Sequence, residues 1–105
     1  MPKKKIVSTN SAPAAVGPYS QAVQAGGFLF ISGQLALDAK TGNMVGDDIT
    51  TQTRQVLNNI KAVLAAEGLT LSNVVKTTVF LKDIQDLAKM NEVYKEFFSI
   101  DPPAR

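Results

Sequence analysis

Two stretches of the chain have the apolar spacing of amphipathic helices. The first runs from about Thr50 to Glu67, where apolar side chains recur every three or four residues. Asp47 and Asp48 precede this stretch, and Gly68 follows it at the position of a left-handed C-terminal cap. The predicted buried stripe comprises Thr53, Val56, Leu57, Ile60, Val63 and Leu64.

The second helix is predicted to begin after Asp83, which suits an N-cap, and to end near Ser99. Pro102 and Pro103 prevent it from continuing far. Asn91 places a polar amide on the apolar side, and this amide needs a hydrogen-bond partner. The predicted apolar stripe comprises Leu87, Met90, Tyr94, Phe97 and Phe98.

Strand character appears in four other segments. Residues Val74 to Lys82 alternate most clearly, with Val75, Thr77, Val79 and Leu81 on the face expected to meet the helices. Gly26 and Gly27 predict a turn between two short strands. The remaining predicted strands are Lys5 to Ser8, Ser20 to Ala25 and Phe28 to Ser32.

The order strand, strand, strand, helix, strand, helix favours an α+β fold with both helices on one side of a sheet. Phe28 to Ile31 is apolar at every position, which is typical of a strand covered on both faces. Two helices cover only one face. We therefore expect a second copy of the chain to cover the other face, and thus a homo-oligomer.

The composition excludes several kinds of functional site but does not identify the function. The 105 residues suit one domain, and the net charge of +2 does not indicate a nucleic-acid-binding surface. The only basic run, Lys3 to Lys5, is typical of a solvated terminus. With no Cys and no His, disulfides, thiol nucleophiles, Cys/His zinc sites and imidazole bases are excluded. No window approaches the ~20 apolar residues of a membrane span, so a cytoplasmic protein is expected.

The remaining candidates for chemistry are Tyr19, Ser32, Asn91 and Arg105, besides the carboxylates. Pro13 and Pro18 predict an ordered bend that directs the Tyr19 side chain. Each candidate also has a structural interpretation: the Tyr19 ring could fill a groove, Ser32 could end a strand, Asn91 could bind a backbone carbonyl, and Arg105 could be a frayed terminal cation. Residue type alone leaves these alternatives open.

Four motifs in this order resemble the RidA (YjgF-type) family of reactive intermediate deaminases: APAAVGPYSQAV, FISGQL, VVKTTVFLKDIQDLAKMNEVYKEFF and PPAR. The resemblance covers essentially the whole chain. It implies a chorismate-mutase-like α+β subunit and a homotrimer built round a sheet barrel. It also implies three ligand clefts, each between neighbouring subunits.

Matched motif to motif, GPY supplies Tyr19, SGQ supplies Ser32 and Gly33, MNEVY supplies Asn91, and PAR supplies Arg105. The resemblance implies that the arginine grips the carboxylate of a 2-imino or enamine acid, such as 2-aminoacrylate or 2-aminocrotonate. The implied activity is that of a 2-iminobutanoate/2-iminopropanoate deaminase, a hydrolase that yields a 2-keto acid and ammonia. Such hydrolysis requires a clamped carboxylate and a positioned water, and no metal, cofactor or covalent nucleophile.

The chain departs from the family pattern after Arg105. Family members continue through two further strands, and the second bears a glutamate thought to position the water. We therefore expect residues 1 to 105 to be a single RidA-like domain, truncated before those strands and inactive in this form. The alternatives are a non-catalytic protein that binds a small ligand such as a 2-keto acid, and an RNA-directed translation inhibitor or ribonuclease.

Overall fold

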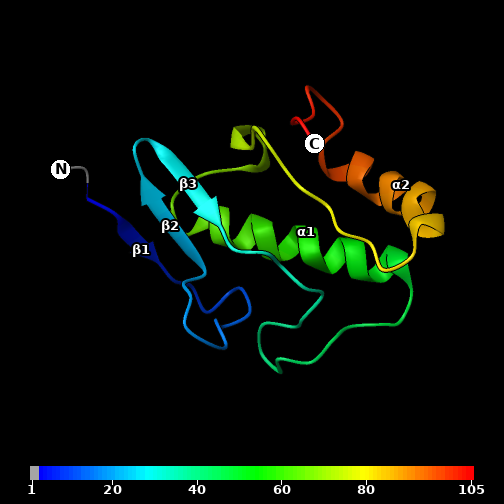
Figure 1. The fold of residues 1–105 in the computed structure, drawn as a ribbon, viewed down its shortest axis with the longest axis horizontal. Coiled ribbons are helices and arrows are strands. Elements are labelled where there is room, and N and C mark those ends of the chain that lie inside the picture. The colour runs from blue at the N-terminus through cyan, green and yellow to red at the C-terminus, as the bar shows by residue number, and fades with distance from the viewer. Residues whose placement is uncertain (1–2) are drawn as a thin grey trace.

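A computed structural model describes residues 3 to 105 and shows an α+β arrangement of one sheet and two helices (Figure 1). The strands are β1 (Lys5–Val7), β2 (Ala22–Ala25) and β3 (Phe28–Ile31), and the helices are α1 (Ile49–Ala65) and α2 (Leu87–Phe97). Two short 3-10 turns, Leu71–Asn73 and Ile84–Asp86, complete the regular elements. The predicted α+β class and both predicted helices are confirmed.

The sheet is antiparallel, in the order β1-β2-β3. Its register pairs Val7 with Ala22 and Ala22 with Ile31. Gly26 and Gly27 connect β2 to β3 with φ angles of 58° and 80°. Because a two-residue hairpin turn of this kind needs positive φ at both positions, the glycine pair fixes the hairpin where the sequence predicts it.

Helix α1 contributes to two separate hydrophobic clusters. Near its C-terminal end, Val63 packs with Val7 and Ala22 beneath the sheet. Near its middle, Leu57 packs against α2. The second cluster consists of Leu57, Met90, Tyr94 and Phe98, with Val74 and Leu81 packed against it. The sheet and α2 therefore lie against different parts of α1, as Figure 1 shows.

The segment from Val74 to Lys82, predicted as the clearest strand, does not form a strand. It runs beside α1 and α2 with a single parallel bridge, between Lys76 and Ala104. The predicted inward face is also wrong for Val75, which is 68% exposed, whereas Val74 packs against the second cluster. Alternating side chains favour an extended backbone, but a strand also needs a neighbour along its length. Within residues 3 to 105, only the segment around Ala104 provides one.

The outer face of the sheet is uncovered. Phe28 and Phe30 are 60% and 62% exposed, with ring centroids 6.2 Å apart, whereas Leu29 and Ile31 pack onto the first cluster. As predicted, the chain itself covers only one face of this strand. No helix in the described part of the chain is long and apolar enough to cross a membrane.

Asp48 caps the N-terminus of α1 and is expected to make its stability depend on pH. Its carboxylate accepts hydrogen bonds from the backbone N–H and the hydroxyl of Thr51, at 2.9 and 3.0 Å. The backbone bond is the main reason that the pKa of Asp48 lies below its ordinary value of 3.8. This stabilisation is fully present above pH 3.8 and is lost as the pH falls through the lower, folded-state pKa.

We therefore expect Asp48→Ala to lower the free energy of unfolding at pH 7. In strong acid the free energies of unfolding of Asp48→Ala and the wild type should converge. Asp48→Asn keeps a capping oxygen without a titrating charge, so it should stay close to the wild type at pH 7. Urea unfolding of the three proteins between pH 2 and pH 7 measures this. A difference between the wild type and Asp48→Ala that does not shrink in acid would contradict the assignment.

Candidate active site

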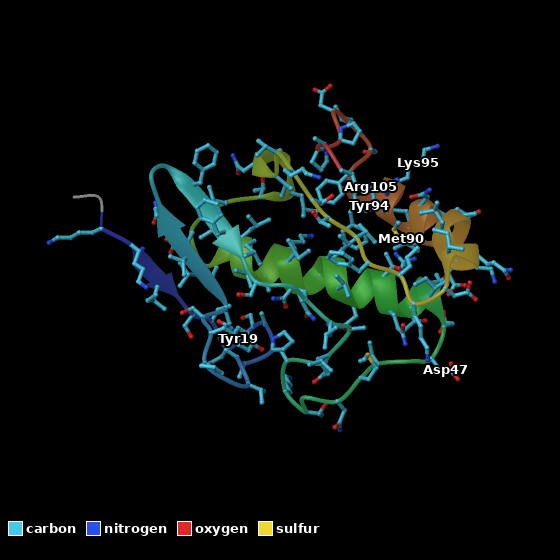
Figure 2. The ribbon with its side chains drawn as sticks, in the orientation of Figure 1. Tyr19, Asp47, Met90, Tyr94, Lys95 and Arg105 are labelled. Atoms are coloured by element: carbon cyan, nitrogen blue, oxygen red, sulfur yellow. The ribbon has the colours of Figure 1, made fainter. Side chains whose placement is uncertain are left out.

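Arg105 is held against one face of α2. Its Nη1 donates to the Asn91 side-chain oxygen at 2.8 Å, and its guanidinium carbon lies 4.8 Å from the centre of the Tyr94 ring. Asn91 and Tyr94 are three residues apart on α2 and therefore share a face of that helix. Figure 2 shows Arg105, Tyr94 and Met90 grouped together. The Asn91 amide, which was predicted to need a hydrogen-bond partner, thus has one in Arg105.

The backbone before Arg105 is anchored as well as its side chain. After α2 the chain reverses at Asp101, whose φ of 47° is left-handed. Ala104 then donates its N–H to the Val75 carbonyl at 3.0 Å and accepts from the Thr77 N–H at 2.9 Å. In this structure Arg105 is therefore part of the fold and not a frayed terminal cation.

Arg105 lines a cavity of about 270 Å³. Its wall is mostly apolar, and Arg105 is its one charged lining residue within the described chain. The lining residues are Thr78, Val79, Leu81, Ile84, Leu87, Met90 and Arg105. A cation at the edge of an apolar cavity suits a small ligand that has a carboxylate and a short apolar part.

Tyr19 belongs to a second group of residues, beside the sheet. Its hydroxyl accepts a hydrogen bond from the Val16 N–H at 3.2 Å, and its ring is exposed. The bend that carries it is fixed by the buried side chain of Gln21. The Gln21 amide donates to the carbonyls of Thr9, Ala12 and Pro13, and its oxygen accepts from the Thr9 N–H. The ordered bend predicted from the prolines is present.

Ser32 and Gly33 lie on the same side as Tyr19. The Ser32 hydroxyl donates to the Ser20 carbonyl at 2.5 Å, so it ties the end of β3 to the segment before β2. Gly33 and Tyr19 both line a smaller cavity of about 60 Å³. The other lining residues are Pro13, Ala14, Gln21, Gln34, Leu35 and Leu37.

The chain does not bring its two groups of predicted site residues together. Asn91 and Arg105 meet at α2, whereas Tyr19 lies at the far side of the molecule, next to the sheet (Figure 2). Among the described residues, no cluster of acidic side chains could hold a metal ion.

Two residues in these groups were not predicted as part of a site. Tyr94 was assigned to the apolar stripe, although its spacing of three from Asn91 was a usable signal. Gln21 is a polar residue directly before β2, and its place next to an apolar segment was a second usable signal.

The chain matches the family described as Endoribonuclease L-PSP over residues 9 to 105. It is 58% identical over 102 residues to a RutC family protein of Pyrococcus horikoshii, covering 97% of this chain and 81% of the relative. It is 46% identical over 102 residues to a mouse (Mus musculus) protein named 2-iminobutanoate/2-iminopropanoate deaminase, covering 97% and 76%. The solved structure of Escherichia coli TdcF with bound serine is 42% identical, with a TM-score of 0.91, and covers 96% of this chain and 81% of that one.

The chain belongs to the Endoribonuclease L-PSP family, which contains the RidA proteins, and the resemblance inferred from its motifs is confirmed. Its α+β fold is that of the solved members. Relatives named as reactive intermediate deaminases indicate a deaminase-type enzyme. The catalytic roles of Tyr19, Ser32, Asn91 and Arg105 stay predictions.

We expect the Tyr19 hydroxyl to act on a ligand and not to hold the fold together. In the structure it makes one exposed hydrogen bond, so Tyr19→Phe should leave the melting temperature nearly unchanged. If the hydroxyl orients the reacting groups, turnover of a 2-imino acid should fall roughly a hundredfold. Calorimetry and an ammonia-release assay measure the two effects. Full activity, or a large loss of stability, would return Tyr19 to a packing role.

Proposed function

We propose that this protein hydrolyses small 2-imino or 2-enamine acids to 2-keto acids and ammonia. The observation that carries this proposal is Arg105, which lines a mostly apolar cavity and whose guanidinium contacts Asn91 and Tyr94. The name of the mouse relative and the serine bound to Escherichia coli TdcF support a small carboxylate ligand.

Arg105 is proposed to bind the substrate carboxylate. A guanidinium has five N–H donors in a planar fork, and the Asn91 contact involves only Nη1. Donors remain for a bidentate contact with a carboxylate, which holds the adjacent carbon in one orientation. The short side chain of the substrate would lie along Val79, Leu87 and Met90 in the cavity.

The proposed reaction needs only water besides the substrate. An enamine first takes a proton at carbon and loses one from nitrogen, which gives the imine. Water adds to the imine carbon: a C–O bond forms, the π electron pair moves to nitrogen, and one proton passes from the water to nitrogen. The amino group then takes a second proton, the C–N bond breaks as ammonia leaves with the bonding pair, and the hydroxyl loses its proton to give the keto group. The protein's contribution is orientation of the carboxylate and transfer of protons.

Tyr19, Ser32 and Gly33 are proposed to reach this substrate from a neighbouring copy of the chain. Two observations support a shared site: the two groups lie apart within one chain, and the outer face of the sheet exposes Phe28 and Phe30. Burial of such a face against another copy is favourable. A homotrimer, as the resemblance implies, would place one site at each boundary between copies.

RNA cleavage is a second candidate, favoured only by the family's description as an endoribonuclease. The Arg105 cavity offers a single cation among apolar walls, which suits one carboxylate better than a polyanionic backbone. Incubating the same preparation with RNA tests this candidate. If the Arg105→Ala variant still cleaves RNA, the RNA-cleaving activity does not use the proposed site.

Removing the arginine should strongly reduce the deaminase activity. A charge-assisted contact with a carboxylate contributes about 1.5 to 3 kcal/mol, so Arg105→Ala should weaken binding roughly ten- to 150-fold. Arg105→Lys should restore little because an ammonium cannot reproduce the fork. The assay measures ammonia released from freshly generated 2-aminoacrylate. Full activity in Arg105→Ala would remove the clamp from the mechanism.

The assay is run on the 105-residue chain and on a continued chain, extended past Arg105 with the corresponding residues of the Pyrococcus relative. The comparison tests the water-positioning carboxylate that the resemblance assigns to that region. Equal activity of the two forms would show that this carboxylate is dispensable. Binding of 2-oxobutanoate by both forms without ammonia release from either would favour a non-catalytic binding protein.

A further inference from the structure

We propose that Tyr94 is a positioning residue that sets the direction of the Arg105 guanidinium. Its effect on substrate rests on the proposed function, because there Arg105 binds the substrate carboxylate. Tyr94 was expected only to fill the core, and it does belong to the buried cluster at α2. Its ring face and its hydroxyl, however, both contact the parts of the molecule that carry Arg105.

The Tyr94 ring supports the guanidinium directly. The guanidinium carbon lies 4.8 Å from the ring centre, within the range of a cation–π contact. The Asn91 bond alone holds one nitrogen and leaves the guanidinium free to turn about that contact. A ring beneath the guanidinium carbon adds a second point of contact and restricts that turning. Together, Asn91 and Tyr94 fix both the position and the orientation of the Arg105 guanidinium.

The Tyr94 hydroxyl secures the segment that anchors the arginine backbone. Its oxygen lies 2.7 Å from the Thr77 hydroxyl oxygen, at hydrogen-bond distance. Thr77 in turn donates its backbone N–H to the carbonyl of Ala104, the residue before Arg105. The contacts therefore form a closed path from Tyr94 through Thr77 and Ala104 to Arg105 and back to the Tyr94 ring.

The Tyr94 ring also contacts a second aromatic side chain, that of Phe98. Phe98 directly follows α2 as its C-cap residue, and its ring centroid lies 4.8 Å from that of Tyr94. Both residues are buried, at 8% and 7% exposure, in the same cluster. Phe98 thus offers a matched control. Truncating it also removes an aromatic ring from this cluster, but it does not remove the cation–π contact with Arg105.

Three variants separate positioning from packing. Tyr94→Leu removes the ring and the hydroxyl, Tyr94→Phe keeps the ring alone, and Phe98→Leu is the packing control. Each is made in the 105-residue chain and in the continued chain. The measurements are the dissociation constant for 2-oxobutanoate, KM and kcat for ammonia release, and the melting temperature.

We expect both leucine variants to lower the melting temperature, since each truncates a buried ring. Only Tyr94→Leu should weaken 2-oxobutanoate binding and raise KM, roughly three- to tenfold, because the lost contact acts through the guanidinium. The value of kcat should change less, since a carboxylate contact serves the bound substrate and the transition state alike. Tyr94→Phe keeps the ring contact and loses only the hydrogen bond to Thr77, so it should weaken binding less than Tyr94→Leu does.

A proton NMR measurement on the wild-type protein tests the geometry without any ligand. Side-chain protons of Arg105 that lie over the Tyr94 ring should be shifted upfield, and Tyr94→Leu should remove the shift. Wild-type Arg105 protons at their unstructured positions would overturn the proposal, even if Tyr94→Leu failed to fold.

Two further outcomes would also contradict the positioning role: a KM rise in Phe98→Leu equal to that in Tyr94→Leu, or unchanged binding in Tyr94→Leu. The proposed function fails separately, if the wild-type continued chain releases no ammonia while the Arg105 shift is present.

Discussion

Two backbone hydrogen bonds join Ala104 to Val75 and Thr77, and the proposed site depends on them. They bring the end of the chain alongside the segment that packs against α2, and so place the Arg105 guanidinium next to Asn91 and the Tyr94 ring. Without this pairing, the backbone of Arg105 would not be held next to α2. The arginine contact with α2 is therefore a consequence of tertiary pairing and not of local sequence.

The position of Arg105 explains why one chain holds only part of the proposed site. Tyr19 stands on a bend fixed by Gln21 at the sheet, whereas Arg105 stands at α2. Helix α1 contributes to both of the hydrophobic clusters that support them, at different points along its length. The exposed Phe28 and Phe30 form an apolar face that a second copy could cover. One proposed oligomer would therefore both complete the site and cover the outer face of the sheet.

Local signals predicted most of the fold. Helix α1 and the hairpin at Gly26 and Gly27 follow from spacing and turn chemistry within a few residues. The prediction failed at Val74 to Lys82, where strand formation depends on a distant neighbour that alternation does not report. At the site, the motifs predicted Asn91 and Arg105 as candidates, and the structure shows them in contact. The role of Tyr94 depends on tertiary contacts and was not predicted.

Complementation between two inactive variants tests the shared site most directly. Tyr19→Phe and Arg105→Ala, each in the continued chain, are co-expressed, purified as mixed oligomers and assayed for ammonia release, with each variant alone as control. If each site takes Tyr19 from one copy and Arg105 from its neighbour, one of the three sites in every mixed trimer regains both residues. We predict a comparable recovery of activity. Mixed oligomers that stay as inactive as the separate variants would contradict the shared site.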